Sequence, residues 1–512
     1  MKKIAALLLL LSLFAFLALP IFSTYQVNET NLARLQSKME KPEHWAFFEA
    51  EIAKLKGNDY SKISFLAAIN QSMNSVKNEI NAKYDDASGK KLYEIKNYQF
   101  ALMRECATGF PTEQKKQVFW SLFFLTLLGG FLYIFPMFFE GQAGIKNNGV
   151  FFSPWLNRGI PGIFLGTVLI VFYVVLYFFP YLISEQIALF DSLKSLWNPN
   201  AQAGQWFMYG SLYTIAVFVM GARMFAKYRH SPYQQLRTAS IMFFQLVFAF
   251  IIPEILEFLN EPYIQFHVAF PLDYSFFFDY RLYSYVGKAD WGYAGGSMTF
   301  LGIKTGILFL AWGILFSLIG VPVLTYFYGK RWMCSWVCGC GGLAETLGDP
   351  FRQQSDKSLK AWKIERYLIY SVLVFSVVMT IFVLLSYQVS SLQGIAYSLR
   401  SNYGFLIGSI FSGVIGTGFY PLMGNRMWCR FGCPLAAIMG IVQRYKSRFQ
   451  ITTNGGQCIS CGNCSTYCEM GIDVRAYAQK GENIVRASCV GCGICAAVCP
   501  RGVLKLENIA RK

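Results

Sequence analysis

Long apolar runs follow one another over most of the chain and predict helices that cross a membrane. A helix needs about 20 apolar residues to span the hydrocarbon core of a bilayer. Runs of about this length occur at residues 4–22, 118–139, 160–183, 206–225, 239–258, 306–328, 367–387 and 404–422. The pattern therefore predicts an all-α polytopic membrane bundle of about eight helices.

Lys and Arg alternate along the polar connections between these runs. The connections 223–237 and 329–366 are rich in Lys and Arg, whereas 184–205, 259–303 and 388–403 hold one or two each. Loops that are rich in Lys and Arg remain on the cytoplasmic side of the membrane. We therefore expect both ends of the chain in the cytoplasm.

The same pattern predicts the domain organisation. Residues 1–23 read as a signal peptide or signal anchor, and residues 24–117 as an exported polar segment that is largely helical. Residues 118–422 form the helix bundle, with a cytoplasmic Cys-x-x-x-Cys loop at 334–338. Residues 423–449 form a cytoplasmic Cys-x-x-x-Cys-Pro segment, and residues 450–512 form a separate cysteine-rich domain.

Composition supports a membrane protein and narrows its chemistry. Charged residues make up only 15% of the chain, against about 25% in soluble proteins. The net charge of +17 fits cytoplasmic loops better than a nucleic-acid surface, so we expect no nucleic-acid partner. None of the three histidines (His44, His230 and His267) lies in the middle of an apolar run, so a haem held by paired histidines is not expected.

The strongest chemical signal is a cysteine pattern that repeats after 31 residues. The run C-x2-C-x2-C-x3-C occurs twice between Cys458 and Cys499. In this spacing three thiolates hold one cubane and the fourth crosses to the other. The expected [4Fe-4S] ligands are Cys458, Cys461, Cys464 and Cys499 for cluster one, and Cys489, Cys492, Cys495 and Cys468 for cluster two. We expect Gly462, Gly491 and Gly493 to let the backbone turn tightly. The cysteine pattern resembles the bacterial two-[4Fe-4S] ferredoxin domain, which implies that residues 450–512 form a small α+β ferredoxin domain.

A second repeat has a period of 95 residues and lies beside the membrane. Gly329-x-Arg331 precedes Cys334 and Cys338, and the same pattern recurs from Gly424 through Arg426 to Cys429 and Cys433. Cysteines four apart on a helix share a face but are too far apart for an easy disulfide. Four such thiolates could bind a third iron–sulfur centre, zinc or copper, act as dithiols, or simply be buried apolar side chains.

The two repeats together resemble the membrane-bound polyferredoxin family typified by NapH, NosR and CcoG. The resemblance covers roughly residues 304–505 and is carried by 331–348 and 426–468. Pro434 follows the second Cys pair, whereas Gly339 and an extra Cys340 follow the first, and Glu469 stands where the family often has proline. The resemblance implies electron transfer in a bacterial inner membrane. For NapH-like members it implies quinol oxidation.

Other polar residues are weaker candidates. Glu254 and Glu257 fall near the outer end of an apolar run, where a carboxylate could accept a quinol proton or simply face the interface. His267, near Glu261 and Asp273, could sit at a quinone mouth or in an aromatic belt. Cys106 is expected to be a free or packed thiol.

These observations predict a membrane-bound electron-transfer protein. It would connect the quinone pool with a redox partner through two [4Fe-4S] clusters, as a subunit of quinol dehydrogenase type. Two alternatives stay open at this point. One is an assembly or maturation factor that reduces or delivers a metal, and the other is a redox sensor.

Overall fold

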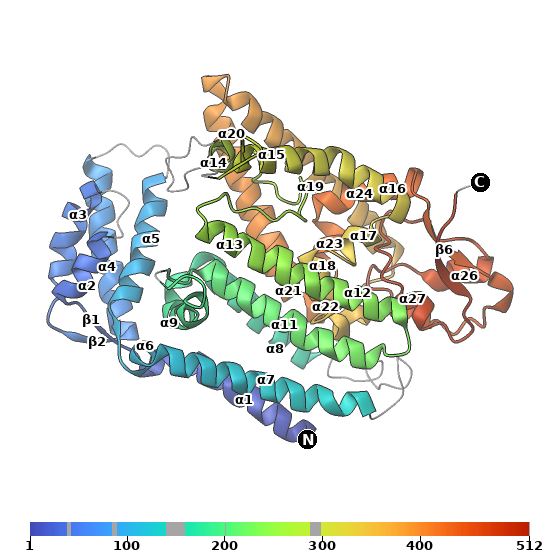
Figure 1. Cartoon of the computed structure of the whole chain (residues 1–512), viewed down its shortest axis with the longest axis horizontal. Helices are drawn as coiled ribbons and strands as arrows, with labels where there is room; N and C mark the ends of the chain where they lie inside the picture. Colours follow the sequence, from blue (N-terminus) through green and yellow to red (C-terminus); the bar gives the residue numbers. More distant parts are fainter. Residues whose placement is uncertain (38–41, 84–89, 140–158, 200, 287–297, 511–512) are drawn as a thin grey trace. The chain divides into compact units, whose positions relative to one another are not determined.

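A computed structural model describes the chain except for residues 38–41, 84–89, 140–158, 200, 287–297 and 511–512. The chain divides into two compact units (Figure 1). The first comprises residues 1–136 and 174–209, and the second comprises 137–173 and 210–512.

The first unit contains a folded polar domain together with parts of the membrane helices. The elements of the whole unit are α1 (Lys2–Ala18), β1 (Thr24–Gln26), α2 (Glu29–Ser37), α3 (Pro42–Ala53), β2 (Asp59–Ser61), α4 (Lys62–Lys83), α5 (Lys90–Glu105), β3 (Ala107–Thr108), α6 (Phe110–Glu113), the start of α7 (Lys115–Phe139), the end of α8 (Ile160–Phe178), α9 (Ser184–Leu189), α10 (Asp191–Lys194) and the first residues of α11 (Gln205–Lys227). The three short strands pair antiparallel in the order β2-β1-β3. The polar segment is therefore not helical throughout. In its small sheet, the backbone N–H and C=O groups of the central strand β1 pair with β2 on one side and β3 on the other.

Buried side chains from the strands, helices and loops of the polar domain form its core. Tyr25 stacks on Phe65 with ring centroids 4.8 Å apart, and both are fully buried. Cys106 belongs to the same core and is 1% exposed. It is a packed thiol, and burial raises its pKa to about 12.

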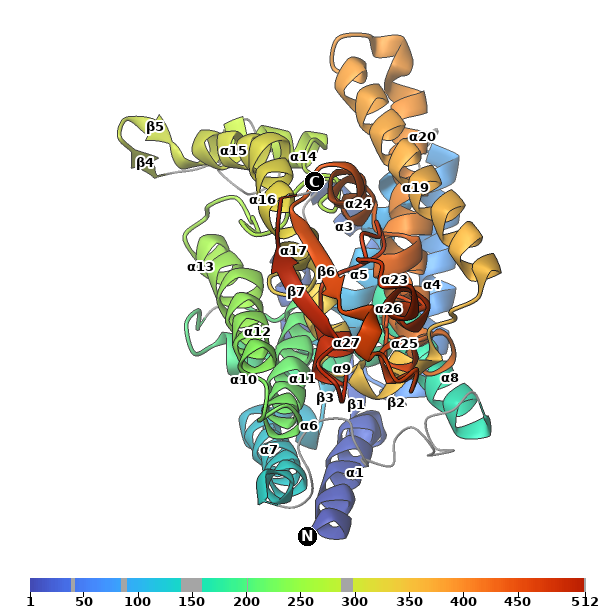
Figure 2. The same cartoon turned by 90° about the vertical axis from the view of Figure 1, so that its right-hand side faces the viewer.

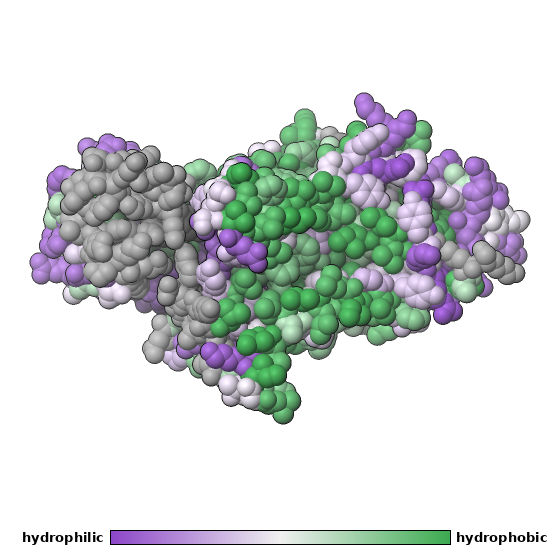
Figure 3. Space-filling view, turned by 90° about the horizontal axis from the view of Figure 1, so that it is seen from above, coloured by the Kyte–Doolittle hydropathy of each residue, from purple (hydrophilic) through white to green (hydrophobic). Residues whose placement is uncertain are grey.

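The second unit contains most of the predicted bundle and the ferredoxin lobe. The bundle elements are α12 (Pro232–Phe243), the π-helix η4 (Phe244–Ile251), α13 (Ile252–Phe258), α14 (Asp279–Val286), β4 (Thr299–Phe300), β5 (Ile303–Lys304), α15 (Thr305–Leu315), the π-helix η5 (Phe316–Gly320), α16 (Val321–Tyr328), α17 (Arg331–Cys334), α18 (Gly339–Glu345), α19 (Leu359–Ser386), α20 (Gln393–Tyr403), the π-helix η8 (Gly404–Ile415), α21 (Gly416–Gly418), α22 (Tyr420–Met423), α23 (Met427–Phe431) and α24 (Pro434–Tyr445). Apolar side chains cover a broad band of the surface in Figure 3.

Seven helical stretches among the described residues are long and apolar enough to cross a membrane. They are Lys2–Phe22, Lys115–Phe139, Ile160–Phe178, Gln205–Lys227, Pro232–Phe258, Thr305–Tyr328 and Leu359–Ser386. The eighth predicted run, 404–422, lies in a helical stretch that begins with α20 and includes η8. It is not among the seven. The polytopic helical fold with a ferredoxin domain is confirmed.

The ferredoxin lobe contains the α+β elements expected from the sequence. Strand β6 (Phe449–Thr453) pairs antiparallel with β7 (Leu504–Asn508) (Figure 2), and the short helices α25 (Asn463–Thr466), α26 (Val474–Lys480) and α27 (Ile494–Ala497) lie between them in the chain. Gly462 and Gly493, 31 residues apart, have φ of 80° and 76° and begin α25 and α27. The sequence repeat is therefore a structural repeat as well.

Candidate iron–sulfur site

The two membrane Cys motifs begin in the same way. Gly329 ends α16 with φ of 64°, and Gly424 ends α22 with φ of 94°. Such positive φ values favour glycine. A Cβ atom on Gly329 would lie 2.5 Å from Gln443 Oε1, and one on Gly424 would lie 2.3 Å from Ser355 Oγ. The glycine of each Gly-x-Arg motif is thus required by the turn and by close packing.

The second cysteine of each pair caps a helix. Cys338 precedes α18 and Cys433 precedes α24, both in extended conformation. Pro434 occupies the first turn of α24, a favoured position because no backbone donor is lost there. Gly339 occupies the corresponding position of α18. The helix therefore begins at the same place after the cysteine, although the first motif has glycine where the second has proline.

The fold brings both Cys pairs together in one group, which we call the membrane cysteine site. Its members are Cys334, Cys429 and Cys433, which are buried, and Cys338, which is half-buried. The thiol of Cys433 interacts electrostatically with those of Cys429, Cys334 and Cys338. Burial raises the pKa of Cys334 to about 12 and that of Cys433 well above its usual value. A bound metal would be needed to ionise these thiols at neutral pH.

Cys338 differs from the other thiols of this site. A hydrogen bond from Cys340 lowers its pKa to about 7 against the effect of burial, with help from the backbone N–H groups of Gly341 and Cys340. The extra cysteine that follows the first motif therefore belongs to the site. Four thiols with local N–H donors suit an iron–sulfur cluster or a soft metal ion.

The lobe brings most of its thiols into two groups. Cys458, Cys461, Cys464 and Cys499 line one pocket, which is the expected site of cluster one. The thiol of Cys495 interacts with those of Cys489 and Cys468. Cys492, the fourth expected ligand of cluster two, instead has its Sγ within 4.8 Å of ligand oxygens of Glu345 and Glu469. Its assignment to cluster two stays a prediction.

Four bundle side chains hold the loop that carries Cys489 and Cys492. Four consecutive carbonyl oxygens of this loop each accept a hydrogen bond at 2.7–2.8 Å. The donors are Gln443 to Cys489, Ser335 to Val490, Tyr233 to Gly491, and Gln234 to Cys492. Ser335 directly follows Cys334, so this contact connects the membrane cysteine site with the cluster-two loop.

Gln443 makes the largest contribution to this clamp. Its amide donates to the carbonyls of Arg486 and Cys489, and its oxygen accepts from the backbone N–H of Lys330 at 2.6 Å. We expect Gln443→Met to leave three buried polar groups without partners and to destabilise the protein by roughly 2 kcal/mol or more. Denaturant unfolding followed through the iron–sulfur absorbance tests this. Substituting the exposed Gln479 in the same way serves as the control.

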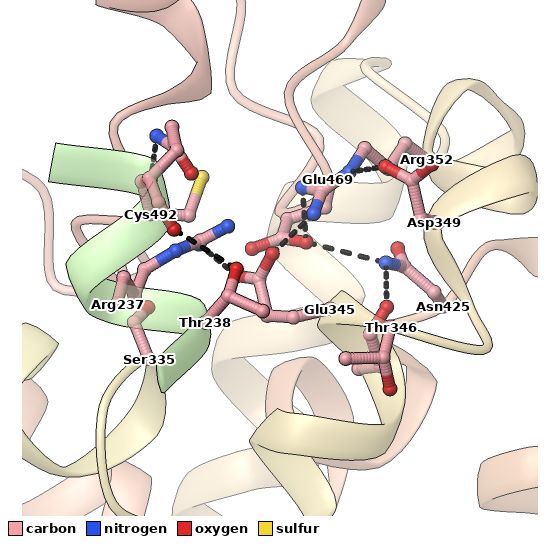
Figure 4. A network of polar contacts seen from close by, with 12 residues as sticks. Arg237, Thr238, Ser335, Glu345, Thr346, Asp349, Arg352, Asn425, Glu469 and Cys492 are labelled. Atoms are coloured by element: carbon pink, nitrogen blue, oxygen red, sulfur yellow. Dashed lines mark hydrogen bonds and ion pairs between the residues drawn. The ribbon is translucent and has the colours of Figure 1, made fainter. Parts of the chain in front are cut away.

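A buried network of charges contacts Cys492 of the lobe (Figure 4) and, through Arg426, the Cys334 carbonyl of the membrane cysteine site. Glu345 and Glu469 point toward one another between Arg237 and Arg352. Arg352 pairs with Glu469 at 2.6 Å and with Asp349 at 2.9 Å, and Arg426 pairs with Glu469 at 3.0 Å. The further members are Arg223 and Lys227, which pair with Asp349, and Arg237, which pairs with Glu345.

This network carries an excess of positive charge. Five cations face three carboxylates, giving a formal charge of +2. Burial by itself would raise the pKa of Glu345. Three neighbouring guanidinium groups nevertheless hold this pKa well below its usual range, and they belong to Arg237, Arg352 and Arg426. Clusters with thiolate ligands are anionic, and nearby positive charge stabilises the reduced form. The network is therefore placed to favour electron uptake by neighbouring clusters.

The sequence alone did not identify these charged residues. Glu469 was noted only as a departure from a family pattern, yet it is fully buried and contacts both Arg352 and Arg426. Arg331 and Arg426 occupy equivalent positions in the 95-residue repeat, but their surroundings differ. Arg426 is buried and donates to the Cys334 carbonyl at 3.0 Å, whereas Arg331 stacks on Phe449 in the lobe.

The weaker candidates lie in separate environments. His267 is 5% exposed and packs against Phe244 and Phe248, and burial lowers its pKa to about 4. Glu261 accepts hydrogen bonds from the Met298 N–H and the Thr305 hydroxyl, and Asp273 pairs with Arg281 at 2.6 Å. Glu254 is buried in α13 and Glu257 is half-buried. A role for either carboxylate in proton transfer stays a prediction.

Comparison with known proteins agrees with this geometry. Residues 457–504 match a family model described as a 4Fe-4S dicluster domain, and residues 310–358 and 404–452 both match one described as a 4Fe-4S binding domain. The chain carries ferredoxin-type 4Fe-4S domains. The second model covers both copies of the membrane Cys motif. The sequences that form the membrane cysteine site are thus similar to iron–sulfur binding sequences.

A curated relative supports the same class of protein. "Putative electron transport protein YccM" of Escherichia coli (strain K12) is 27% identical over 169 residues. The match covers 28% of this chain and 43% of the relative, less than half of its length. No solved structure matches the chain. The resemblance to ferredoxin-type iron–sulfur electron-transfer proteins of membranes is confirmed.

Proposed function

We propose that this protein moves electrons between the quinone pool and a redox partner through two [4Fe-4S] clusters. The observation that carries the proposal is the order of the thiol groups. The membrane cysteine site is buried, the cluster-two loop is clamped to the bundle, and the cluster-one pocket includes the exposed Cys461. This order suits a relay from the membrane to a protein surface.

The proposed relay includes a third centre at the membrane cysteine site. Cys334, Cys338, Cys429 and Cys433 would hold it, and Arg426 would donate to it, since Arg426 Nη1 lies 3.8 Å from Cys429 Sγ. In this proposal the protein lies in a bacterial inner membrane with the ferredoxin lobe in the cytoplasm. The buried charge network then lies at the membrane surface, where Lys and Arg are common.

Anaerobic reduction of the purified protein tests the proposal. We expect a menaquinol analogue to bleach the visible absorbance of the clusters and to produce EPR signals of reduced [4Fe-4S] centres. Reduction by dithionite but not by the quinol would contradict a quinol-linked function. Iron and acid-labile sulfide analysis of the same sample would count the centres.

The surface around cluster one indicates the charge of the redox partner. Ile459 is 53% exposed, and the exposed Arg475 and Arg501 line the same pocket as the cluster-one cysteines. Cationic rims steer acidic proteins to their docking sites. We propose an acidic electron carrier as the partner.

Charge reversal at this rim gives a direct prediction. We expect Arg475→Glu with Arg501→Glu to slow electron transfer to an acidic carrier such as flavodoxin by roughly tenfold or more at low salt. The effect should shrink as salt is added, because exposed charges are screened. Stopped-flow measurements at two ionic strengths test this. Reversal of Lys446, which is exposed outside this pocket, should change the rate little.

One observation favours a second candidate function. Cys338 accepts a hydrogen bond from the exposed Cys340, which lowers the pKa of Cys338 to about 7, and paired thiols with a lowered pKa are suited to take up and transfer metal ions. A maturation factor of this kind would need Cys338 and Cys340 for metallation of its client. It would not need turnover of a quinol, which the reduction experiment distinguishes.

A further inference from the structure

A cavity of about 200 Å³ lies where α19 meets α24 and the lobe segment before Cys489. Its wall is strongly cationic. The cations lining it are Lys330, Arg366, Arg430, Arg444 and Arg486, and the one carboxylate among its lining residues is Glu365. The cavity therefore has a marked excess of positive charge.

The chain satisfies two of the buried cations only in part. Arg430, 3% exposed, donates from Nε to Glu365 Oε2 at 2.8 Å and from Nη1 to the Asp356 carbonyl at 2.8 Å, while its buried Nη2 has no hydrogen-bond partner among the described residues. Lys330 is 1% exposed, and its ammonium donates to the Ala436 carbonyl at 3.4 Å. No carboxylate in the described part of the chain pairs with it. Both donors call for an additional acceptor.

Aromatic stacking orders the cations at the mouth of the cavity. The guanidinium groups of Arg486 and Arg366 lie 4.5 Å and 5.3 Å from the centre of the Trp362 ring. Stacking on an aromatic ring leaves the N–H edges of arginine free to bind an anion. An anionic oxygen group thus fits this end of the site.

A groove continues from the cavity along α19, with Lys363 and Arg366 at its near end and apolar side chains at its far end. It shares Arg366 and Tyr370 with the cavity and extends past Tyr367 to Val374 and Val378. These positions recur every three or four residues and so lie on one face of the helix. Tyr367 is 76% exposed and Val374 is 61% exposed. Since α19 is long and apolar enough to span a membrane, this face meets acyl chains.

We propose that the cavity and groove form a binding site for one anionic phospholipid. The phosphate group lies among the cations of the cavity, and an acyl chain follows the groove along α19. Basic pockets beside membrane helices bind anionic headgroups in this way. A free anion would use the cavity but not the continuous apolar groove, and a zwitterionic lipid would leave the excess positive charge uncompensated.

The bound lipid would hold the ferredoxin lobe against the bundle. The cavity wall includes Val485–Ser488, directly before the cluster-two ligand Cys489, and the Ser488 hydroxyl donates to Glu365 of α19. The site is independent of any reaction with a quinone. It therefore stands or falls separately from the proposed electron-transfer function.

Lipid retention by the full-length protein tests this proposal. The purified protein is delipidated, equilibrated with phosphatidylcholine vesicles with or without phosphatidylglycerol, and examined by native mass spectrometry. We expect one retained phosphatidylglycerol per chain. The double variant Arg366→Gln with Arg444→Gln, both at exposed positions, should weaken retention roughly tenfold or more, since each cation contributes to anionic lipid binding.

The control is Lys360→Gln, because Lys360 is exposed at the start of the same helix but does not line the cavity. It should retain the lipid as the unmodified protein does. Iron–sulfur absorbance reports whether each variant folds, and Arg366→Gln alone replaces the double variant if the latter does not. Equal retention in all variants would overturn the proposal. Displacement by inorganic phosphate or by a menaquinol analogue as readily as by phosphatidylglycerol would overturn it as well.

Discussion

Replacing Cys429 and Cys433 by serine is expected to slow reduction of the ferredoxin lobe by a menaquinol analogue roughly 100-fold or more. The two thiols belong to the buried membrane cysteine site, whose metal centre would lie on the path of the electrons. Loss of residues that only support a metal site already costs about 10–100-fold. Anaerobic stopped-flow absorbance measures the rate.

The control variant is Cys106→Ser, since Cys106 is also buried but belongs to the core of the polar domain. It should keep the rate of the unmodified protein. Dithionite should still reduce the lobe clusters of the double variant, which shows that these clusters are intact. An unchanged rate with quinol would remove the membrane cysteine site from the electron path.

Glu469→Gln is expected to lower the free energy of unfolding by roughly 3–5 kcal/mol, the usual cost of breaking a buried ion pair. Glu469 is fully buried, and its carboxylate pairs with Arg352 at 2.6 Å and Arg426 at 3.0 Å. Glutamine keeps the shape but removes one of the carboxylates that these two buried guanidinium groups share, so the positive charge of the network is compensated by Glu345 and Asp349 alone. Denaturant unfolding followed by tryptophan fluorescence and by cluster absorbance measures the change.

Glu482→Gln provides the matched control, because Glu482 is an exposed carboxylate in the same lobe. Its substitution should change stability by less than about 0.5 kcal/mol. If Glu469→Gln had an equally small effect, the buried network would not be what joins the lobe to the bundle. In EPR redox titrations, Glu469→Gln should also raise the potential of a neighbouring cluster, because removing a carboxylate adds net positive charge.

Local patterns in the sequence were sufficient to predict the helical bundle and the ferredoxin lobe. Apolar runs of spanning length define membrane helices because the bilayer core sets their length. The spacing of the eight lobe cysteines predicts its 31-residue repeat because each cluster needs thiols at fixed steps along a turning backbone. Positive φ values at Gly462, Gly491 and Gly493 confirm the predicted turns.

Contacts between distant segments could not be predicted in this way. The partners of Glu469 include Arg352, 117 residues earlier, and the Cys489 carbonyl binds Gln443. Such residues follow no periodic pattern in the sequence. The role of a buried polar side chain depends on its hydrogen-bond or ion-pair partner, which can be far away in the chain, and not on its neighbours in the sequence. The repeat even made Arg331 and Arg426 look equivalent, although only Arg426 is buried beside the cysteines.

The type of protein and the spacing of its thiols could be predicted from short stretches of the chain, because neighbouring residues encode membrane helices and cysteine runs. The folded chain was needed to show that the two Cys pairs meet, that Cys340 lies beside Cys338, and that a cationic cavity opens beside Cys429. Thiols, charges and cavities act together only where folding brings separate segments of the chain into contact.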